Sequence, residues 1–348
     1  QEFELIAKTF MGLEPVLAQE LTQLGANNIQ IGRRMVSFSG DKEMMYRANF
    51  QLHTAIRILK PIRHFKAQSA EDVYEEIQKI DWSEYIEDGK TFSVDSVVYS
   101  EEFRNSRFVT YKVKDAIVDQ FREKTGSRPN ISVSNPDIRL NIHIAEDRAT
   151  LSLDSSGESL HRRGYRQESV EAPLNEVLAA GMILMSGWKG DTDFIDPMCG
   201  SGTILIEAAL MALHMAPGLR RKRLGFANLL IHDGALWEKV RAEAEETARE
   251  YQEKGLPGKI MGFDRDPEII GIARENAEKA GVADFVSFGV SELRDLRNPF
   301  DGAPAVMVTN PPYGERLGNV KDLLTVYREL GDVLKKEFPG STAAVISS

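Results

Sequence analysis

The chain has 348 residues, of which 42% are hydrophobic and 28% charged, and its formal net charge is −10. This length allows two or three domains with a sizeable buried core, and the sequence has no apolar run near the roughly 20 residues that span a bilayer. Because Cys199 is the only cysteine, it excludes an internal disulfide and argues against a cysteine-based metal site. We therefore expect a globular, cytoplasmic protein without a metal.

The first half of the chain alternates strand-like and helical periodicity. We predict strands at residues 3–10, 35–39, 55–65, 92–99, 138–144 and 151–153, and helices at 13–24, 44–49, 70–80 and 109–125. The last two strands form a hairpin that turns at Glu146-Asp147. Residues up to about 155 would thus form one or two small α+β units. The isolated histidines His53, His64 and His143 lack partners at ligand spacing, and we interpret them as structural or surface residues.

The second half becomes a regular strand–helix series after a break at residues 155–159. Ala172 to Asn175 opens a helix, with Pro173 suited to its first turn. Strands follow at residues 194–196, 260–264, 285–290, 305–309 and 342–347, separated by helices at 202–215, 235–254, 267–280 and 321–337. Such alternation predicts an α/β fold with a parallel, doubly wound sheet.

Two basic runs stand out against the negative net charge, at residues 161–166 and 220–223. Phosphates respond to local charge, so the net charge alone does not exclude a nucleic acid partner. The first run has an aromatic residue among its arginines and lies at the predicted domain junction, and both RNA contact and a solvated surface remain open for it. For the second run, a solvated surface is the favoured interpretation.

A glycine-rich segment, Asp196-Pro197-Met198-Cys199-Gly200-Ser201-Gly202-Thr203, follows the first strand of the predicted parallel sheet. Ligands bind beyond the carboxyl ends of such strands, and the two glycines let the backbone approach a ligand closely. The segment lacks the third glycine of a dinucleotide fingerprint and the lysine of a phosphate-binding loop. An acidic residue before the glycines would repel a pyrophosphate but suits a cationic cofactor such as S-adenosylmethionine.

Further candidate cofactor contacts follow the next two strands. Asp264 ends the second strand, beside Arg265, and its carboxylate could accept both hydroxyls of a ribose. Asp266 is interpreted as the cap of the helix that begins at Pro267. After the third strand, Glu292 and Asp295 are alternative partners for an adenine amino group, and the spacing does not distinguish them.

The run Asn310-Pro311-Pro312-Tyr313 directly follows the apolar fourth strand. The amino nitrogen of a nucleobase is a poor nucleophile because its lone pair is delocalised into the ring. The Asn310 side-chain oxygen and the Pro311 carbonyl could accept its two hydrogens and direct the lone pair towards a methyl donor. Tyr313 offers a face on which an extruded base could stack. The sequence therefore predicts methylation of an exocyclic amino group.

These motifs, together with Asn310 to Leu317 and the junction residues 160–166 and 171–175, resemble the bacterial THUMP-domain RNA methyltransferases. That family is also labelled N6-adenine-specific DNA methylase and is similar to the enzyme that makes N2-methylguanine in large-subunit ribosomal RNA. The resemblance implies a ferredoxin-like segment (1–44), a THUMP domain (45–155), a linker (156–171) and a Rossmann-like methyltransferase domain (172–348). It also implies a set of RNA contacts: Arg162, Arg163, Tyr165, Arg166 and Arg316.

The leading hypothesis is therefore an S-adenosylmethionine-dependent methyltransferase acting on guanine N2 in 23S ribosomal RNA. The alternatives are N6-adenine methylation of DNA or RNA, and a non-catalytic RNA-binding assembly factor. Because family sheets continue past the fifth strand into an antiparallel pair, we also expect that the C-terminal strands are missing here. The initial Gln1 likewise suggests that the natural start lies upstream.

Overall fold

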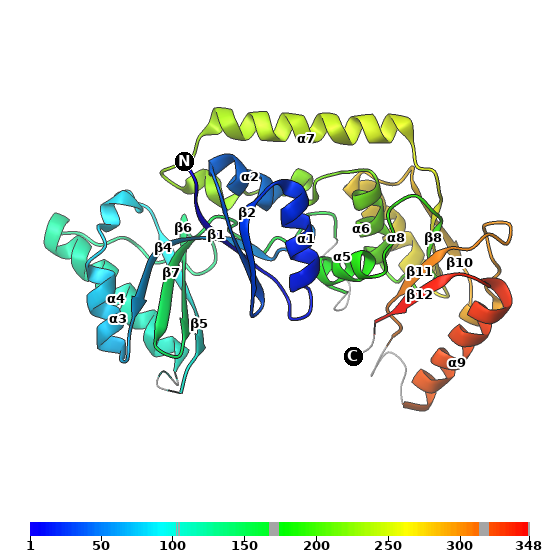
Figure 1. Ribbon diagram of the computed structural model, residues 1–348, viewed down its shortest axis with the longest axis horizontal. Helices are drawn as coiled ribbons and strands as arrows, with labels where there is room; N and C mark the ends of the chain where they lie inside the picture. The colour runs from blue at the N-terminus through cyan, green and yellow to red at the C-terminus, as the bar shows by residue number, and fades with distance from the viewer. Residues whose placement is uncertain (102, 104, 167–173, 313–319, 347–348) are drawn as a thin grey trace.

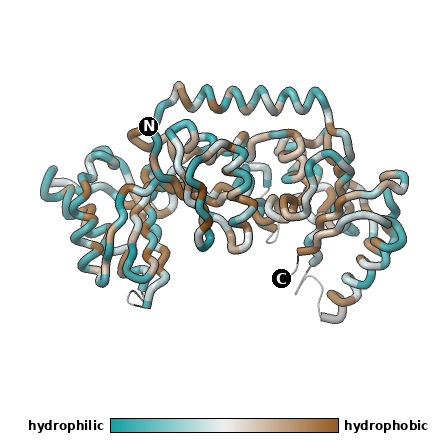
Figure 2. Tube along the Cα trace, viewed as in Figure 1, coloured by the Kyte–Doolittle hydropathy of each residue, from teal (hydrophilic) through white to brown (hydrophobic). Residues whose placement is uncertain are grey.

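The chain folds into two β-sheets with their covering helices (Figure 1). The computed structural model describes all residues except 102, 104, 167–173, 313–319 and 347–348. The described part has no helix long and apolar enough to cross a membrane. In Figure 2 hydrophobic residues gather along the strands of both sheets, whereas the long helix above them is largely hydrophilic.

The first sheet contains seven strands in the order β2-β3-β1-β4-β7-β6-β5. These are β1 (Phe3–Lys8), β2 (Asn27–Gly32), β3 (Met35–Gly40), β4 (Arg57–Lys66), β5 (Phe92–Tyr99), β6 (Ile138–Ala145) and β7 (Arg148–Asp154). Strand β4 pairs antiparallel with both β1 and β7 and so joins two small α+β units into one sheet. The helices are α1 (Glu14–Leu24), α2 (Lys42–Gln51), α3 (Ala70–Gln78) and α4 (Ser106–Thr125).

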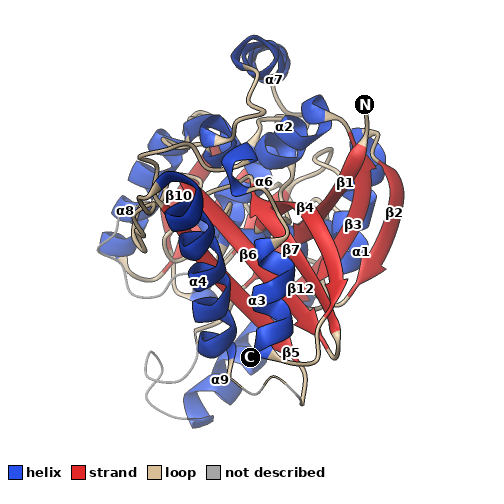
Figure 3. Cartoon of the chain, turned by 90° about the vertical axis from the view of Figure 1, so that its left-hand side faces the viewer, coloured by secondary structure: helices blue, strands red, loops and turns tan. Residues whose placement is uncertain are grey.

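This half differs from the sequence analysis at two places. The expected boundary between residues 44 and 45 falls inside α2, where the chain does not divide. Strand β2 was not predicted, because its sequence is rich in Asn and Gln and all but one of its residues are exposed. Figure 3 shows α3 and α4 lying side by side against the half of the sheet that contains β5, β6 and β7.

The second sheet contains five parallel strands in the order β10-β9-β8-β11-β12, which confirms the predicted doubly wound α/β fold. The strands are β8 (Phe194–Asp196), β9 (Ile260–Asp264), β10 (Val286–Val290), β11 (Val306–Thr309) and β12 (Thr342–Val345). The helices are α5 (Glu176–Met185), α6 (Thr203–Ala212), α7 (Gly234–Lys254), α8 (Pro267–Ala280) and α9 (Val320–Glu337). The strand order reverses between β8 and β11, so a ligand site is expected at their carboxyl ends.

Helix α5 begins later than the sequence predicted. Asn175 caps it, because the Asn175 side-chain oxygen accepts a hydrogen bond from the backbone N–H of Val177 at 2.8 Å. Glu176 is thus the first helical residue. Pro173, which we placed in the first turn, lies outside the described residues.

Helix α7 joins the two halves of the molecule, along the upper side in Figure 1. Its first part packs Trp237, Val240 and Ala244 into the core of the seven-stranded sheet, while Ala248 packs into the core of the parallel sheet. Trp237 and Tyr46 of α2 have ring centroids 5.8 Å apart. Buried apolar contacts therefore hold the two halves in a fixed arrangement.

Candidate active site

The centre of the site is the point where β8 and β11 end side by side. Asp196, the last residue of β8, is 1% exposed. Its Oδ1 accepts a hydrogen bond from the Thr309 hydroxyl at 2.7 Å and another from the Met198 N–H at 3.1 Å. Thr309 ends β11 and immediately precedes Asn310. The hydrogen bond between Asp196 and Thr309 thus joins the predicted cofactor loop to the predicted catalytic run.

Asp196 is a buried carboxyl, and no cation is among the groups that shift its pKa. Its pKa is raised to about 7, chiefly by burial and to a smaller extent by the neighbouring Asp264 carboxylate, while the hydrogen bonds from Thr309 and Met198 act in the opposite direction. Near neutral pH, Asp196 is therefore divided between its charged and neutral forms. Burial also raises the pKa of the Cys199 thiol well above its usual range, so that thiol stays protonated.

The glycine-rich loop is tied to the end of β9. The Cys199 N–H donates to the Phe263 carbonyl at 2.8 Å, and the Gly200 N–H donates to Asp264 Oδ2 at 3.1 Å. The other oxygen of Asp264 accepts the Asp266 N–H at 3.0 Å. The structure therefore brings together the loop after β8 and the carboxylate after β9, which the sequence had placed in one site.

Two glycines in this region are required by close packing. Gly202 has φ of 87°, and a Cβ at this position would lie 3.2 Å from Ala273 Cβ and 3.3 Å from the Phe288 ring. In the middle of β9, a Cβ on Gly262 would lie 2.0 Å from Leu205 Cδ1. Gly262 was missed in the sequence, where it appears only as part of a strand. By contrast, a Cβ on Gly200 would meet no atom within 4 Å, so the loop borders open space.

The remaining cofactor candidates lie around the same edge of the sheet. Pro197 and Ser201 are buried, and the Ser201 carbonyl accepts a hydrogen bond from Asn276 Nδ2 of α8 at 3.0 Å. Arg265 is exposed after β9. Glu292 and Asp295 are both exposed at a short 3-10 helix (η4, Leu293–Asp295) that follows β10. The structure leaves the choice between them open.

The catalytic run is described only in part. Asn310 is half-buried directly after β11, Pro311 is buried and Pro312 is half-buried. Tyr313 and Arg316, the predicted stacking and RNA-binding residues, lie outside the described residues. The described part places the Asn310 and Pro311 acceptors at the switch point, beside the loop that follows Asp196.

The basic junction is more buried than its sequence indicated. Arg163 and Tyr165 are each 2% exposed, and both contact Glu207 of α6. Arg163 Nη2 lies 2.9 Å from Glu207 Oε1, and the Tyr165 hydroxyl donates to Glu207 Oε2 at 2.7 Å. The expectation that these two side chains contact RNA is therefore wrong, because both are buried and bonded to Glu207 inside the protein. Arg162 is exposed and stays a candidate.

Arg166 links the junction to the cofactor loop. Its guanidinium donates to the Thr203 hydroxyl at 2.9 Å, lies 2.7 Å from Glu176 and also contacts the Leu174 carbonyl. Burial raises the pKa of Glu176 to about 7, and the Arg166 guanidinium acts against this rise. Thr203 is the first residue of α6 and directly follows Gly202, so the bond from Arg166 fixes the end of the cofactor loop.

The second basic run is divided between the interior and the surface. Arg221 donates to four backbone carbonyls of residues 156–162, at 2.9 to 3.3 Å, and so fixes the linker. Arg220, Lys222 and Arg223 are exposed. The favoured interpretation as solvated surface thus fits three of the four residues.

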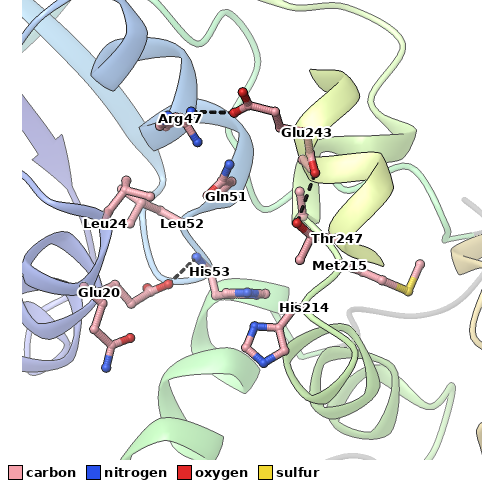
Figure 4. A pocket seen from close by; sticks show the side chains of 13 residues that line it. Glu20, Leu24, Arg47, Gln51, Leu52, His53, His214, Met215, Glu243 and Thr247 are labelled. Atoms are coloured by element: carbon pink, nitrogen blue, oxygen red, sulfur yellow. Dashed lines mark hydrogen bonds and ion pairs between the residues drawn. The ribbon is translucent and has the colours of Figure 1, made fainter. Parts of the chain in front are cut away.

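A cavity of about 380 Å³ lies away from this site, between α1 and α2 of the first half and the end of α6 and α7 of the second (Figure 4). Its walls include Arg47, paired with Glu243 at 2.8 Å, and the facing imidazoles of His53 and His214. The pKa of His53 is lowered to about 3, chiefly by burial and then by the nearby charges of Arg163 and His214. His53 is therefore neutral. Among the described residues, no group of three or more His, Cys, Asp or Glu side chains could hold a metal.

Comparison with known families finds three matched segments along the chain. Residues 163–348 match the RMKL-like methyltransferase domain, residues 67–154 match the THUMP domain, and residues 4–59 match the RlmL ferredoxin-like domain. Strand β4 (Arg57–Lys66) begins inside the ferredoxin-like match and ends just before the THUMP match.

The chain spans about half the length of the curated relatives it matches. The chain is 45% identical over 343 residues to the ribosomal RNA large subunit methyltransferase K/L of Syntrophotalea carbinolica, covering 97% of this chain and 48% of that protein. It is 41% identical over 345 residues to the protein of the same name from Vibrio campbellii, covering 99% and 49%.

Solved structures agree with the fold. A predicted N6-adenine-specific DNA methylase from Listeria monocytogenes has a TM-score of 0.88 and 32% identity, covering 100% of this chain and 89% of that one. The protein SMU.472, solved as a complex with SAH, has a TM-score of 0.85 and 32% identity, covering 99% and 89%. The family match extends over more than half of the chain, including the entire parallel sheet and its ligand-binding edge. The chain therefore belongs to the family of proteins with an RMKL-like methyltransferase domain.

Proposed function

We propose that the chain is an S-adenosylmethionine-dependent methyltransferase that modifies the N2 amino group of a guanine in 23S ribosomal RNA. The observation that carries the proposal is the position of Asn310 and Pro311 at the switch point, joined through Thr309 to Asp196. Two hydrogen-bond acceptors thus lie at the edge of the sheet where a cofactor is expected. An RNA substrate of this kind implies a cytoplasmic enzyme.

The residues present suit S-adenosylmethionine. Open space borders Gly200, and the half-buried Asp264 carboxylate beside it could accept ribose hydroxyls. Asp264, together with Asp196 in its ionised form, would supply negative charge for a sulfonium cation, and SMU.472 was solved with the demethylated product SAH. Glu292 or Asp295 would contact the adenine. When bound, the cofactor supplies an electrophilic methyl group.

The chain itself would orient the nucleobase. The Asn310 side-chain oxygen and the Pro311 carbonyl would accept the two amino hydrogens, which localises the nitrogen lone pair and points it at the methyl group. Pro311 has no N–H, so it brings no competing donor. Tyr313 would stack on the base, although it lies outside the described residues. Positioning, rather than a strong general base, would then account for most of the rate enhancement.

The choice of ribosomal RNA is supported by the names of the curated relatives and by the THUMP domain match. The name of the Listeria relative favours a second candidate, N6-adenine methylation. An Asn-Pro-Pro-Tyr run can hold the amino group of either base, so the run itself does not select guanine. We favour ribosomal RNA because the curated relatives are named for it and share more sequence with this chain. We favour guanine because the family that the sequence resembles is similar to the enzyme that makes N2-methylguanine in large-subunit ribosomal RNA.

The test is transfer of a labelled methyl group from S-adenosylmethionine to 23S ribosomal RNA, transfer RNA and DNA in parallel, followed by nucleoside analysis. We expect label in 23S ribosomal RNA as N2-methylguanosine. Label in DNA alone, as N6-methyladenine, would replace the proposal by its alternative. Binding of RNA with no label in any substrate would favour a non-catalytic assembly factor.

A further inference from the structure

Three helices end at the cavity of about 380 Å³ that lies between the two halves of the molecule (Figure 4). Gln23 and Leu24, the last two residues of α1, line this cavity, and so does Gln51, the last residue of α2. Helix α6 ends at Ala212, and His214 just beyond it also lines the cavity. The negative ends of three helix dipoles therefore lie at one space.

The chain supplies little positive charge to balance these helix ends. None of the three helices has a basic residue in its last turn. The pKa of His53 is lowered to about 3 and that of His214 is also lowered, in both cases chiefly by burial, so neither ring is charged near neutral pH. Among the described residues that line the cavity, Arg47 is the one Lys or Arg. It is already paired, with Glu243 at 2.8 Å and Glu43 at 3.5 Å.

Glu20 adds a carboxyl group to the cavity wall. Its Oε2 accepts the His53 N–H at 2.8 Å, and its Oε1 accepts the Thr54 N–H at 2.9 Å and also the Thr54 hydroxyl. Because a carboxylate has about four acceptor positions, these three bonds leave Oε2 able to accept another donor. In the part of the chain that the structure describes, Glu20 takes part in no ion pair. Burial raises the pKa of Glu20, and a cation beside it would favour the ionised form.

A nitrogen without a partner belongs to the same wall. Nδ1 of His53 is buried, and among the described residues it has no hydrogen-bond partner. The backbone of His53 is fixed on both sides, because its N–H donates to Glu20 and its carbonyl accepts Arg163 Nη2 at 2.8 Å. In the tautomer protonated at Nε2, Nδ1 is an acceptor. A buried acceptor left unpaired costs free energy, and a bound donor would remove that cost.

The rest of the wall suits methylene groups, because five apolar side chains line it: Leu24, Leu52, Met215, Ala216 and Ala244. An ammonium group carries a positive charge and three donors, which match the carboxyl group, the helix-end carbonyls and the unpaired nitrogen. The volume lies in the range of small-molecule sites. An alkyl chain that bears ammonium groups therefore fits both the polar and the apolar parts of the wall.

We infer that this cavity binds an aliphatic polyamine, whose ammonium groups bind Glu20 and the ends of α1, α2 and α6 while its methylene groups pack on the apolar wall. The inference goes beyond the proposed function, because the cavity lies between the two halves of the molecule and not at the ligand-binding edge of the parallel sheet.

Titration calorimetry of the 348-residue chain with spermidine, in buffer that contains excess Mg²⁺, tests this inference. The Mg²⁺ screens the acidic surface, which attracts any polycation. We expect one saturable site for spermidine. Octanediol, an uncharged chain of equal length, should not bind. The absence of a saturable site, or equal binding of octanediol, would overturn the inference.

A variant with a lysine in the wall locates the site. Gln51→Lys places an ammonium group of the chain itself at the end of α2, and this like charge should weaken spermidine binding more than about ten-fold. The variant should be no less stable to heat than the parent, because a lysine in the last turn complements the helix dipole.

Two controls separate the site from the charge. Gln51→Met changes the same side chain without adding charge, and Gln78→Lys adds the same charge at the last residue of α3, outside the cavity wall. Both should bind spermidine within a few-fold of the parent. Parent affinity in Gln51→Lys, or an equal loss in Gln78→Lys, would overturn the inference. Because methyl transfer does not enter these measurements, either result leaves the proposed function intact.

Discussion

Removing the Glu207 carboxylate should be among the most damaging single changes in the chain. Glu207 is fully buried, and it holds both the Arg163 guanidinium at 2.9 Å and the Tyr165 hydroxyl at 2.7 Å. Breaking a buried ion pair by deleting one partner costs about 3–5 kcal/mol, and an orphaned buried hydroxyl costs about 1–3 kcal/mol. Because Arg163 keeps its bonds to the Leu160 and His53 carbonyls, we expect Glu207→Ala to cost about 4–6 kcal/mol.

Urea unfolding of four proteins measures this cost: the parent, Glu207→Ala, Arg163→Met, and the double variant Arg163→Met with Glu207→Leu. The double variant should be more stable than either single variant, because two apolar side chains replace the pair and no buried charge is left alone. RNA affinity should be unchanged in all four, measured under conditions in which each is folded.

Two results would refute this reasoning. A loss of less than about 1 kcal/mol for Glu207→Ala would mean that water reaches the pair in solution. If Arg163→Met lowered the RNA affinity and left the free energy of unfolding unchanged, Arg163 would contact RNA, as the sequence analysis expected.

Three further outcomes are expected. Asn310→Ala should abolish methyl transfer while leaving SAH affinity within a few-fold; near-normal turnover would remove Asn310 from its role as amino-group acceptor. The Asp196 pKa of about 7, against an ordinary 3.8, means that the folded state binds more protons between these values, so stability falls as pH rises through them. Asp196→Asn should remove roughly 3 kcal/mol of that fall between about pH 4.5 and 7.5 in urea unfolding, and an unchanged profile would contradict the raised pKa. Gly262→Ala, whose Cβ would lie 2.0 Å from Leu205 Cδ1, should cost about 1–3 kcal/mol in urea unfolding and weaken SAH binding; full SAH affinity would show that β9 adapts without moving the loop.

The parallel sheet was predictable because its residues carry local signals. Strand β9 and helix α8 begin and end at the residues that the sequence predicted. The apolar strand is followed by Asp266, which caps the helix, and by Pro267, which is its first residue. The weaker signal of β2 was missed, since a polar strand whose side chains face solvent differs little from a loop. Its pairing with β3, rather than its composition, makes it a strand.

The site was predictable where a motif lies in one stretch of chain, and not where it depends on contacts between stretches. The loop from Asp196 to Gly202 meets Asp264 as expected. Thr309 and Asn276 were missed because their roles arise only when strands and helices far apart in sequence come together. Arg163 was misplaced for the same reason. One signal was available, because Glu207 is the only charged residue in the apolar helix α6, and a lone acid there needs a buried cation.

Helix α6 therefore connects the cofactor loop with the junction between the THUMP and methyltransferase segments. Its first residue, Thr203, follows the cofactor loop and accepts a hydrogen bond from Arg166, while Glu207, one turn later, holds Arg163 and Tyr165. All three partners belong to the junction that leads from the THUMP segment. Because these bonds are buried and directly connected, we expect a displacement of the junction to move the cofactor loop through Arg166 and Glu207.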